Sequence, residues 1–455
     1  MDYSNRILCG PMVRISSLPF RLLALEYGAD IVFSEELIDY RLMQCVRVEN
    51  NSLDTVDFVV PGEDRPMLQI HKTREKSRLV VQLGTADGQR ALNAARLVEN
   101  DVAGIDVNMG CPKKFSIQGG MGSALLNHPD KVKQILETLV NNLSIPVSCK
   151  IRCLPSLDAT LSLVRTIATT GVHAITIHGR TRDERNSDEC RETFIQSIVQ
   201  QCPPNVVIVT NGGSTKISSY SDIQNFRLRC GPAHGVMICQ AAMWNPSVFR
   251  PSGSLPISDV AKRFLQICLE FDNHLPNIKY VLQRMYGDLD SENQFYEKML
   301  STETEAQIYT LFDMKNEYEQ SPLEERRLWR EKLRNQFIAK LDEESENNII
   351  EKPAKYIRSD YTATLTPKSI LTAYFIQARK DKPIYHTEEL KPQRIFRTVL
   401  EFDGQRYTTS TWEKSKQLAE QGSAIVCLQS LGVDLTRAKY GINYIKAFFS
   451  PENKV

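Results

Sequence analysis

Residues 103–114 read AGIDVNMGCPKK, and this stretch contains the pattern that decides the fold. The apolar run is interrupted by Asn108 and ends before Gly110. Two further residues, Cys111 and Pro112, follow at the point where a buried strand should stop. The run is continuous rather than alternating, as expected for a strand buried on both faces of a parallel sheet. A turn explains the glycine and the proline, but it does not require a thiol.

Seven similar runs occur along the first 245 residues, and helical patterns such as DGQRALNAARLVEND (87–101) and HPDKVKQILETLVNNL (128–143) lie between most of them. The runs are RILCGPMV (6–13), ADIVFSEEL (29–37), RLVVQLG (78–84), VSCKIR (147–152), AITIHG (174–179), VVIVTNGG (206–213) and GVMICQAA (235–242). Eight strands alternating with helices predict an α/β fold, a (β/α)8 TIM barrel over residues 1–250. A doubly wound open sheet is the alternative. Residues 55–72 look like a hairpin inserted before the third barrel strand.

Polar side chains fall within the last few residues of five different runs. In a barrel, such positions point into the mouth where active sites form. Each residue alone has a structural explanation, since a lone histidine is usually a satisfied core residue, but together they predict a site. They are Gln82, Asn108, Lys150, His178 and Asn211.

Two stretches are suited to a phosphate group. TNGGS (210–214) offers backbone N–H groups without side-chain bulk, and CQAAMWNP (239–246) follows the next strand. Loops after strands 7 and 8 are the usual phosphate site of this fold. The dinucleotide fingerprint GxGxxG is absent, so a mononucleotide such as FMN is the expected ligand. Lys150 and Gln82 would reach the polar edge of its ring.

Length and charge predict two or three domains with different partners. The chain has 455 residues, is 42% hydrophobic and has a net charge of +1. From Lys355 onward there are 16 lysines and arginines against 10 acidic residues, which leaves 40 basic and 45 acidic residues before it. A basic tail on a mildly acidic body points to a nucleic-acid partner for the tail.

Cysteine usage and hydropathy indicate the compartment. The 11 cysteines include no CxxC pair. We therefore expect free thiols and no metal site. The sequence contains no run of 18 or more apolar residues, so no membrane span is predicted. Residues 1–6 lack the features of a signal peptide or transit leader. We therefore expect an intracellular, cytoplasmic protein.

Six motifs in order over about residues 5–250 resemble the flavin-dependent tRNA-dihydrouridine synthases. They are GPMVRISSLPFR, DVNMGCPKK with GGMGSALL, CKIR, TIHGRT, TNGG and AAMWNPSVF. The last motif and the basic tail make the chain similar to the eukaryotic members that act at position 20 of tRNA. The resemblance implies NAD(P)H-driven, FMN-mediated reduction of a uridine. Hydride would pass from flavin N5 to C6, and Cys111 would give C5 its proton.

The resemblance also implies roles for other residues. Pro11, Met12 and Val13 would line the flavin, and Asn108 would orient base or flavin. Gln82, Lys150 and His178 would bind its ring or ribityl chain, and Asn211, Gly212 and Gly213 its phosphate, while Arg180 is assigned to RNA. The family usually has Gly-Arg where this chain has Cys239 and Gln240, so we expect weaker flavin binding.

The second half of the chain divides into a helical part and a tail. Residues 251–345 predict a helical domain and linker, in which the charged stretch 320–345 has no assigned role. EESENNIIEKP (343–353) reads as a flexible junction. The tail, residues 355–445, predicts helix, three strands and helix, with Thr366 as N-cap and a tight hairpin at Asp403-Gly404.

This αβββα order resembles a double-stranded RNA-binding domain over about residues 365–433, a module that reads A-form shape. Its usual lysine cluster is incomplete, because Lys416 matches and Lys414 adds charge, whereas Gln417 and Glu420 replace lysines. LKPQR (390–394) replaces the usual Gly-Pro-x-His loop. We expect modest duplex affinity, with Arg358 and Lys368 compensating.

Two other functions fit the same residues less completely. One is a flavin-dependent barrel oxidoreductase acting on a small molecule, which would not need the tail. The other is a non-catalytic RNA-binding protein, which the Cys239-Gln240 departure favours. The main expectation is tRNA as the partner, with neither DNA nor membrane involved.

Overall fold

The computed structural model describes residues 1–61, 63, 65–231, 235–287, 294–343, 349–362, 364–390, 394–436 and 438–440. The chain divides into two compact units. One consists of Met1–Val59 and Met67–Glu324, and the other of Val60–Pro66 and Glu325–Val455. Among the described residues, no helix combines the length and the apolar character needed to cross a bilayer.

The first unit contains a closed barrel of eight strands, all paired in parallel. This confirms the (β/α)8 prediction and excludes the open sheet. The strand order is β1-β11-β10-β9-β8-β7-β6-β2. The strands are β1 (Ile7–Cys9), β2 (Ile31–Ile38), β6 (Leu79–Gly84), β7 (Gly104–Met109), β8 (Val147–Arg152), β9 (Ala174–His178), β10 (Val207–Asn211) and β11 (Val236–Ile238).

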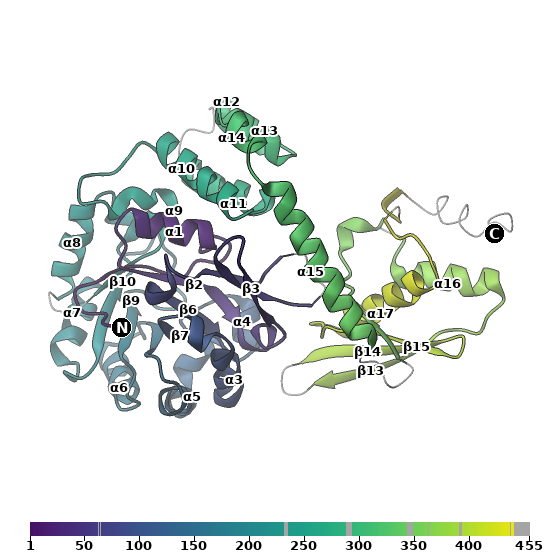
Figure 1. Cartoon of the computed structure of the whole chain (residues 1–455). Coiled ribbons are helices and arrows are strands. Elements are labelled where there is room, and N and C mark those ends of the chain that lie inside the picture. The colour runs from purple at the N-terminus through teal and green to yellow at the C-terminus, as the bar shows by residue number, and fades with distance from the viewer. Residues whose placement is uncertain are drawn as a thin grey trace. The chain divides into compact units, whose positions relative to one another are not determined.

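Helices surround the barrel strands (Figure 1). The longer ones are α1 (Leu18–Glu26), α3 (Gly88–Val98), α5 (Pro129–Asn142), α6 (Leu157–Ala168), α7 (Glu192–Gln201) and α8 (Tyr220–Arg229), and α2 (Asp39–Leu42), α4 (Lys114–Gln118) and α9 (Gln240–Trp244) are short. α3 and α5 confirm the helices predicted at 87–101 and 128–143. Asp87 caps the start of α3, where its Oδ1 accepts the Arg90 N–H at 2.8 Å, and α5 begins at Pro129 without a side-chain cap.

Burial on both faces explains the continuous apolar runs. Leu8, Phe33, Val80, Val209 and Met237, from five different strands, pack into one buried cluster. Branched and large side chains of this kind fill the interior of such barrels, so the structure is a packed core rather than a pore. Most polar side chains of the barrel strands lie near the strand ends, and the buried exception Asp106 bonds Gln82 and Ser148.

A small antiparallel sheet is inserted between β2 and β6. It has the order β3-β4-β5, formed by β3 (Val46–Asn50), β4 (Thr55–Val59) and β5 (Leu68–His71). The hairpin predicted at 55–72 is confirmed. β3 was not predicted, because its residues VRVEN are largely polar and stay mostly accessible to solvent.

Helices follow the barrel, as expected for this part of the chain. They are α10 (Ile257–Glu270), α11 (Leu275–Tyr286), α12 (Gln294–Ser301), α13 (Glu305–Leu311), α14 (Lys315–Glu319) and α15 (Leu323–Glu343). α10 buries an apolar stripe that includes Val260, Phe264 and Ile267. The charged stretch predicted at 320–345 falls largely on α15, and residues 344 and 345 lie outside the described residues.

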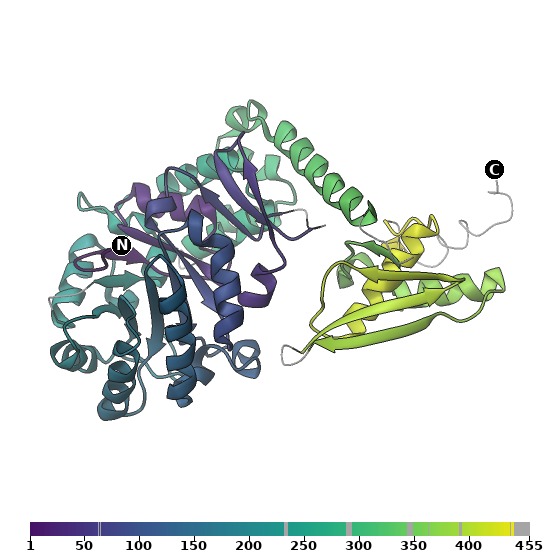
Figure 2. The same ribbon diagram turned by 60° about the horizontal axis from the view of Figure 1, so that its bottom comes forward.

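The second unit has a four-stranded sheet in the order β12-β15-β14-β13, and Figure 2 shows it in front of its helices. Its elements are β12 (Ile349–Lys352), α16 (Pro367–Ala378), β13 (Ile384–Leu390), β14 (Ile395–Phe402), β15 (Gln405–Thr409) and α17 (Lys416–Ser430). The αβββα order is confirmed. Thr366 caps α16 through the Ser369 N–H, and both Asp403 and Gly404 have positive φ, as the tight hairpin requires.

β12 corrects the prediction of a flexible junction. Residues 349–352 pair in parallel with β15, starting from Ile349 opposite Arg406. Ile350 packs against the core of this unit, and Glu351 pairs with Arg397 on β14. Two isoleucines among polar residues give too short a pattern to predict a strand, so burial and pairing decided the outcome. Residues 344–348 of the predicted junction lie outside the described residues.

Candidate active site at the barrel mouth

The barrel brings the predicted polar residues to one end of the strands. Because all eight strands are parallel, their carboxyl ends share one mouth. Register confirms the neighbours, since Asn108 lies opposite Lys150 and Asn211 lies opposite His178. The side chains expected to form one site are therefore adjacent in space.

Asn108 fixes the loop that carries Cys111. Its Oδ1 accepts the N–H groups of Gly110 and Cys111 at 3.0 and 3.1 Å. The Cys111 carbonyl in turn accepts the Ser123 N–H at 3.0 Å. The loop passes so close to Gly122 that a Cβ there would lie 2.7 Å from the Cys111 oxygen. The glycines of the motif are needed for this approach, and the half-buried thiol is held at the mouth.

The Cys111 thiol lies in a mixed electrostatic environment. Burial raises its pKa, and the negative charge of Glu36 raises it further. Interactions with the Lys113 backbone and the Ser116 hydroxyl lower it. The balance favours the thiol over the thiolate at neutral pH, which is the state a proton donor needs.

Glu36 is a site residue that was not predicted from the sequence. It stands on β2 directly after a register shift between Phe33 and Glu36 in the pairing with β6. Burial raises its pKa to about 7, while interactions with Cys111 and Asn108 lower it. The signal was present in the sequence, because two adjacent glutamates close an apolar run in ADIVFSEEL.

Lys150 and His178 present a cation and a neutral imidazole. Burial lowers the pKa of Lys150. It also holds the pKa of His178 well below its usual range, and the positive charges of Lys150, Arg152 and Arg180 reinforce the effect. Within the described residues, the buried His178 Nδ1 has no hydrogen-bond partner. A neutral imidazole with a free nitrogen is suited to binding a polar ligand atom.

The loop after β10 has the form expected of a phosphate site. Asn211 donates Nδ2 to the Met237 carbonyl at 2.8 Å, whereas its buried Oδ1 has no partner among the described residues. Gly212 has φ +115°, which disfavours any side chain. Gly213 lies so close to Phe226 that a Cβ would approach the ring to 2.6 Å.

Cys239 and Gln240 stand where the resemblance predicts Gly-Arg. Asn211 Nδ2 lies 3.7 Å from Cys239 Sγ, and a Cβ on Gly10 would lie 2.5 Å from that sulfur. Gln240 begins α9. The thiol therefore fills the space between the β1 and β10 strand ends, at the position where the resemblance predicts a glycine.

Pro11, Met12 and Val13 form the loop after β1. The Met12 N–H is bonded to Ser16 Oγ at 3.0 Å, and the Val13 side chain is 56% exposed. An exposed valine beside a polar mouth is consistent with the expected lining role, which stays a prediction.

Two predicted residues are buried and already hydrogen-bonded within the protein. Gln82 is buried and donates Nε2 to Asp106 at 2.8 Å, so its amide nitrogen is engaged inside the barrel. Arg180 is only 2% exposed and donates to the carbonyls of Gly212 and Asp188, both at 2.7 Å. This burial does not fit the expected RNA contact of Arg180. Its guanidinium instead supports the backbone of the phosphate loop.

Asp106 is a second site residue that was not predicted. It is fully buried, accepts hydrogen bonds from Gln82 and Ser148, and has its pKa raised to about 6 by burial. Its position in the middle of an apolar strand gave no signal beyond the letter itself. The group anchors the floor of the site.

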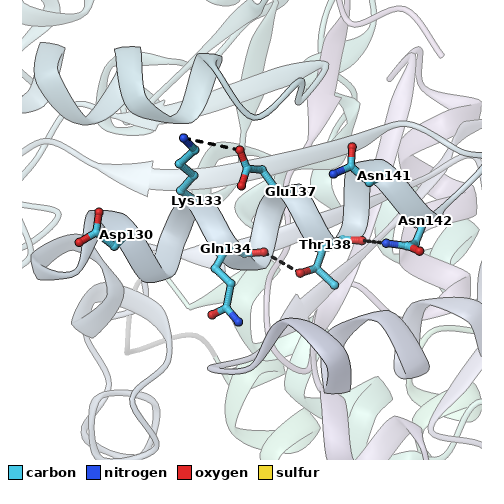
Figure 3. A pocket seen from close by; sticks show the side chains of 7 residues that line it. All are labelled: Asp130, Lys133, Gln134, Glu137, Thr138, Asn141 and Asn142. Atoms are coloured by element: carbon cyan, nitrogen blue, oxygen red, sulfur yellow. Dashed lines mark hydrogen bonds and ion pairs between the residues drawn. The ribbon is translucent and has the colours of Figure 1, made fainter.

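A polar hollow on the outer face of α5 is a different kind of feature (Figure 3). Lys133 pairs with Glu137, Thr138 donates to the Gln134 carbonyl, and Asn142 donates to the Thr138 carbonyl. These contacts all lie within one helix and satisfy its own groups. The hollow has no connection with the residues of the mouth.

The basic residues predicted to bind RNA in the second unit differ in availability. Lys414 and Lys416 are exposed at the start of α17, and Arg358 is also exposed. Lys368, in contrast, pairs with Glu420 and lies 4.6 Å from the centre of the Tyr385 ring. Glu420 also lies 3.9 Å from Lys416. Residues 391–393 of the predicted LKPQR loop lie outside the described residues.

Comparison with known proteins gives two family matches. Residues 7–334 match the family described as Dihydrouridine synthase (Dus), and residues 367–431 match the Double-stranded RNA binding motif. A tRNA-dihydrouridine(20) synthase [NAD(P)+] of Saccharomyces cerevisiae is 41% identical over 318 residues, which are 67% of this chain and 83% of that protein.

Two further relatives cover different parts of the chain. A tRNA-dihydrouridine(20) synthase [NAD(P)+] of Schizosaccharomyces pombe is 42% identical over 293 residues, which are 63% of this chain and 60% of that relative's length. A solved tRNA-dihydrouridine(20) synthase dsRBD domain is 35% identical and covers 19% of this chain and 94% of that one, with a TM-score of 0.19.

Proposed function

Because the chain belongs to the dihydrouridine synthase family, we propose that it reduces the C5–C6 double bond of a uridine in tRNA, at position 20. The reaction would use FMN as cofactor and NADPH or NADH as reductant. The observation that carries the proposal is the Cys111 thiol, which Asn108 holds at the barrel mouth in an environment that favours its protonated state.

The residues of the mouth fit a flavin mononucleotide. Buried polar atoms without partners, here His178 Nδ1 and Asn211 Oδ1, are rare in native structures unless a ligand or water satisfies them. Gly212 and Gly213 carry no side chains, so their backbone N–H groups would be offered to a phosphate. We assign Lys150 and His178 to the ring and ribityl region. When bound, FMN supplies the hydride that reaches C6 of the uracil.

The chain's own contribution to the chemistry is the proton. As C6 gains hydride, negative charge develops at C5 and spreads to the C4 carbonyl. The Cys111 S–H bond breaks, its proton forms the new C5–H bond, and the sulfur keeps the electron pair as thiolate. A thiol whose pKa lies above neutral pH holds a proton when the substrate arrives, and it is acidic enough to release it.

The second unit would deliver the substrate. A fold of this kind reads the A-form shape of a duplex through 2′-hydroxyls and phosphates rather than through sequence. Lys414 and Lys416 are exposed at the start of α17 and can neutralise phosphates. The choice of one uridine then depends on the barrel, with the tail raising the local concentration of tRNA.

The test uses the purified full chain. It should be yellow, its visible absorbance should bleach with NADPH, and the colour should return when unmodified tRNA is added. Mass spectrometry of the tRNA should find a gain of two hydrogens at one uridine. The proposal would be contradicted if NADPH bleaches the protein and the colour then returns with a small free pyrimidine but not with tRNA.

A further inference from the structure

Glu36 occupies the mouth because the strand that carries it is bulged. β2 pairs Phe33 with Val80 and then Glu36 with Gln82, so the β2 chain has one residue more than β6 between the two pairs. The Gln82 N–H donates to Ser34 Oγ at 3.0 Å, so a side chain of β2 satisfies this backbone group at the bulge. Bulges of this type redirect side chains and are common beside active sites.

The bulge gives neighbouring glutamates different surroundings. Glu35 Oε2 accepts the Arg14 N–H at 3.1 Å, on the loop that follows β1. Glu36 instead interacts with the side chains of Cys111 and Asn108. A Cβ on Gly84 would lie 2.7 Å from Glu36 Oε1, so the glycine that ends β6 makes room for this carboxyl group.

The Glu36 carboxyl group is incompletely satisfied. Its Oε1 is buried and has no hydrogen-bond partner within the described part of the chain. Leaving an acceptor in that condition is costly, and each such group in a native structure requires an explanation. A purely structural glutamate would be expected to pair with an arginine or a backbone N–H, as Glu35 does.

The charges that face Cys111 explain why an acidic neighbour is useful. From β8, Lys150 and Arg152 interact with the thiol and favour its ionised form. From α4, the Ser116 hydroxyl also favours the thiolate. Cations beside a cysteine normally turn it into a nucleophilic thiolate. The negative charge of Glu36, from β2, opposes them.

We propose that Glu36 is a positioning residue that keeps the proton on the Cys111 thiol against the cations of the barrel mouth, and so preserves it as an acid. The use of this proton in catalysis rests on the proposed function, whereas the effect of Glu36 on the pKa of the Cys111 thiol does not. A flavin site needs cations near the ring, and a proton donor needs the opposite field a few atoms away. Glu36 reconciles the two requirements.

The decisive measurement is the pH dependence of Cys111 alkylation by iodoacetamide in the purified full chain, followed by mass spectrometry of the peptide. Only the thiolate reacts, so the midpoint reports the thiol pKa. Glu36→Gln removes the charge and should lower the midpoint. Above pH 8, where the Glu36 carboxyl is ionised, and below the thiol midpoint, a shift of about one pH unit would make alkylation roughly tenfold faster. Cys111→Ala identifies the background from other cysteines.

Two matched variants separate charge from packing. Glu35→Gln removes a similarly placed carboxylate that bonds Arg14, and it should keep the wild-type midpoint. Glu36→Asp keeps the charge and should keep most of the effect. Equal midpoints for Glu36→Gln and wild type would overturn the proposal. So would equal shifts in Glu36→Asp and Glu36→Gln, because that result would assign the effect to packing.

A parallel assay distinguishes this inference from the proposed function. In single turnover, dihydrouridine formation should persist to higher pH in wild type than in Glu36→Gln, since a lower thiol pKa removes the proton earlier. An alkylation shift in a protein that forms no dihydrouridine would refute the function and leave the role of Glu36 intact. Dihydrouridine formation without any alkylation shift would refute the role of Glu36 alone.

Discussion

Replacing Asn108 with alanine should uncouple proton delivery from the rest of the reaction. The side chain holds the Cys111 loop through two hydrogen bonds, of 3.0 and 3.1 Å, to consecutive backbone N–H groups. Each is worth about 1 kcal/mol net, so Asn108→Ala should weaken the loop conformation by about 2 kcal/mol. Since 1.4 kcal/mol corresponds to a factor of ten, roughly 30-fold fewer molecules would hold the thiol in place.

The assay compares two half-reactions by stopped flow. Reoxidation of the reduced Asn108→Ala protein by tRNA should slow roughly 30-fold, following the population estimate. Bleaching by NADPH, which does not use Cys111, should change by less than about threefold. Asp87→Ala is a matched control, because Asp87 Oδ1 caps the Arg90 N–H at the start of α3 at 2.8 Å without supporting Cys111. Unchanged reoxidation, or an equal loss in both half-reactions, would refute the reasoning.

Five further outcomes are expected. Cys111→Ala should retain flavin and its reduction by NADPH while losing about 10²–10⁴-fold in tRNA reoxidation, since that is the usual contribution of a general acid; Lys150→Ala should lower flavin content, measured by absorbance, and slow bleaching. Arg21→Met should cost about 3–5 kcal/mol in urea unfolding, because it leaves the buried Glu75 carboxylate without its partner at 2.7 Å. Burial raises the Glu36 pKa from 4.5 to about 7, so between these pH values the folded state keeps a proton that the unfolded chain loses. The free energy of unfolding should therefore fall as pH rises from about 4.5 to about 7. Urea titrations of Glu36→Gln should lack this contribution to the pH dependence. Deleting residues from 344 onward should weaken tRNA binding and flatten its salt dependence in a filter-binding titration, whereas equal slopes would mean that the tail binds something else.

The barrel was predictable because its signal is repeated. Eight apolar runs agree with one another, and five of them carry a polar residue within their last few positions. Continuous apolar runs of this length are typical of a parallel sheet that is buried on both faces. The mouth followed from the same logic, since residues such as Lys150 and His178 interrupt runs that should otherwise stay apolar. The capped helix at Thr366 and the hairpin at Asp403 were equally local, so short-range chemistry sufficed.

The parts that escaped prediction depend on geometry that no local pattern encodes. Glu36 faces Cys111 because a bulge changes the phase of β2, and strict alternation along the strand cannot anticipate that change. Arg180 follows a strand end and looks available for RNA, yet the carbonyls of Gly212 and Asp188 bind it in the interior. Asp106 gave no signal because an isolated acidic residue inside a strand has many explanations.

The strand β12 has a consequence for how the tail survives on its own. A sheet edge with free N–H and C=O groups is a template on which other chains pair and aggregate. β12 covers β15 and is itself the edge strand on this side, but it has only four residues, which limits pairing with other chains, and its Ile350 packs on the apolar core. A proteolytic cut after residue 352 would therefore release a domain that still contains both helices and three strands. In that fragment the edge of β15 and the apolar surface under Ile350 would be exposed. We expect such a fragment to self-associate, whereas one that begins before residue 349 should remain monomeric.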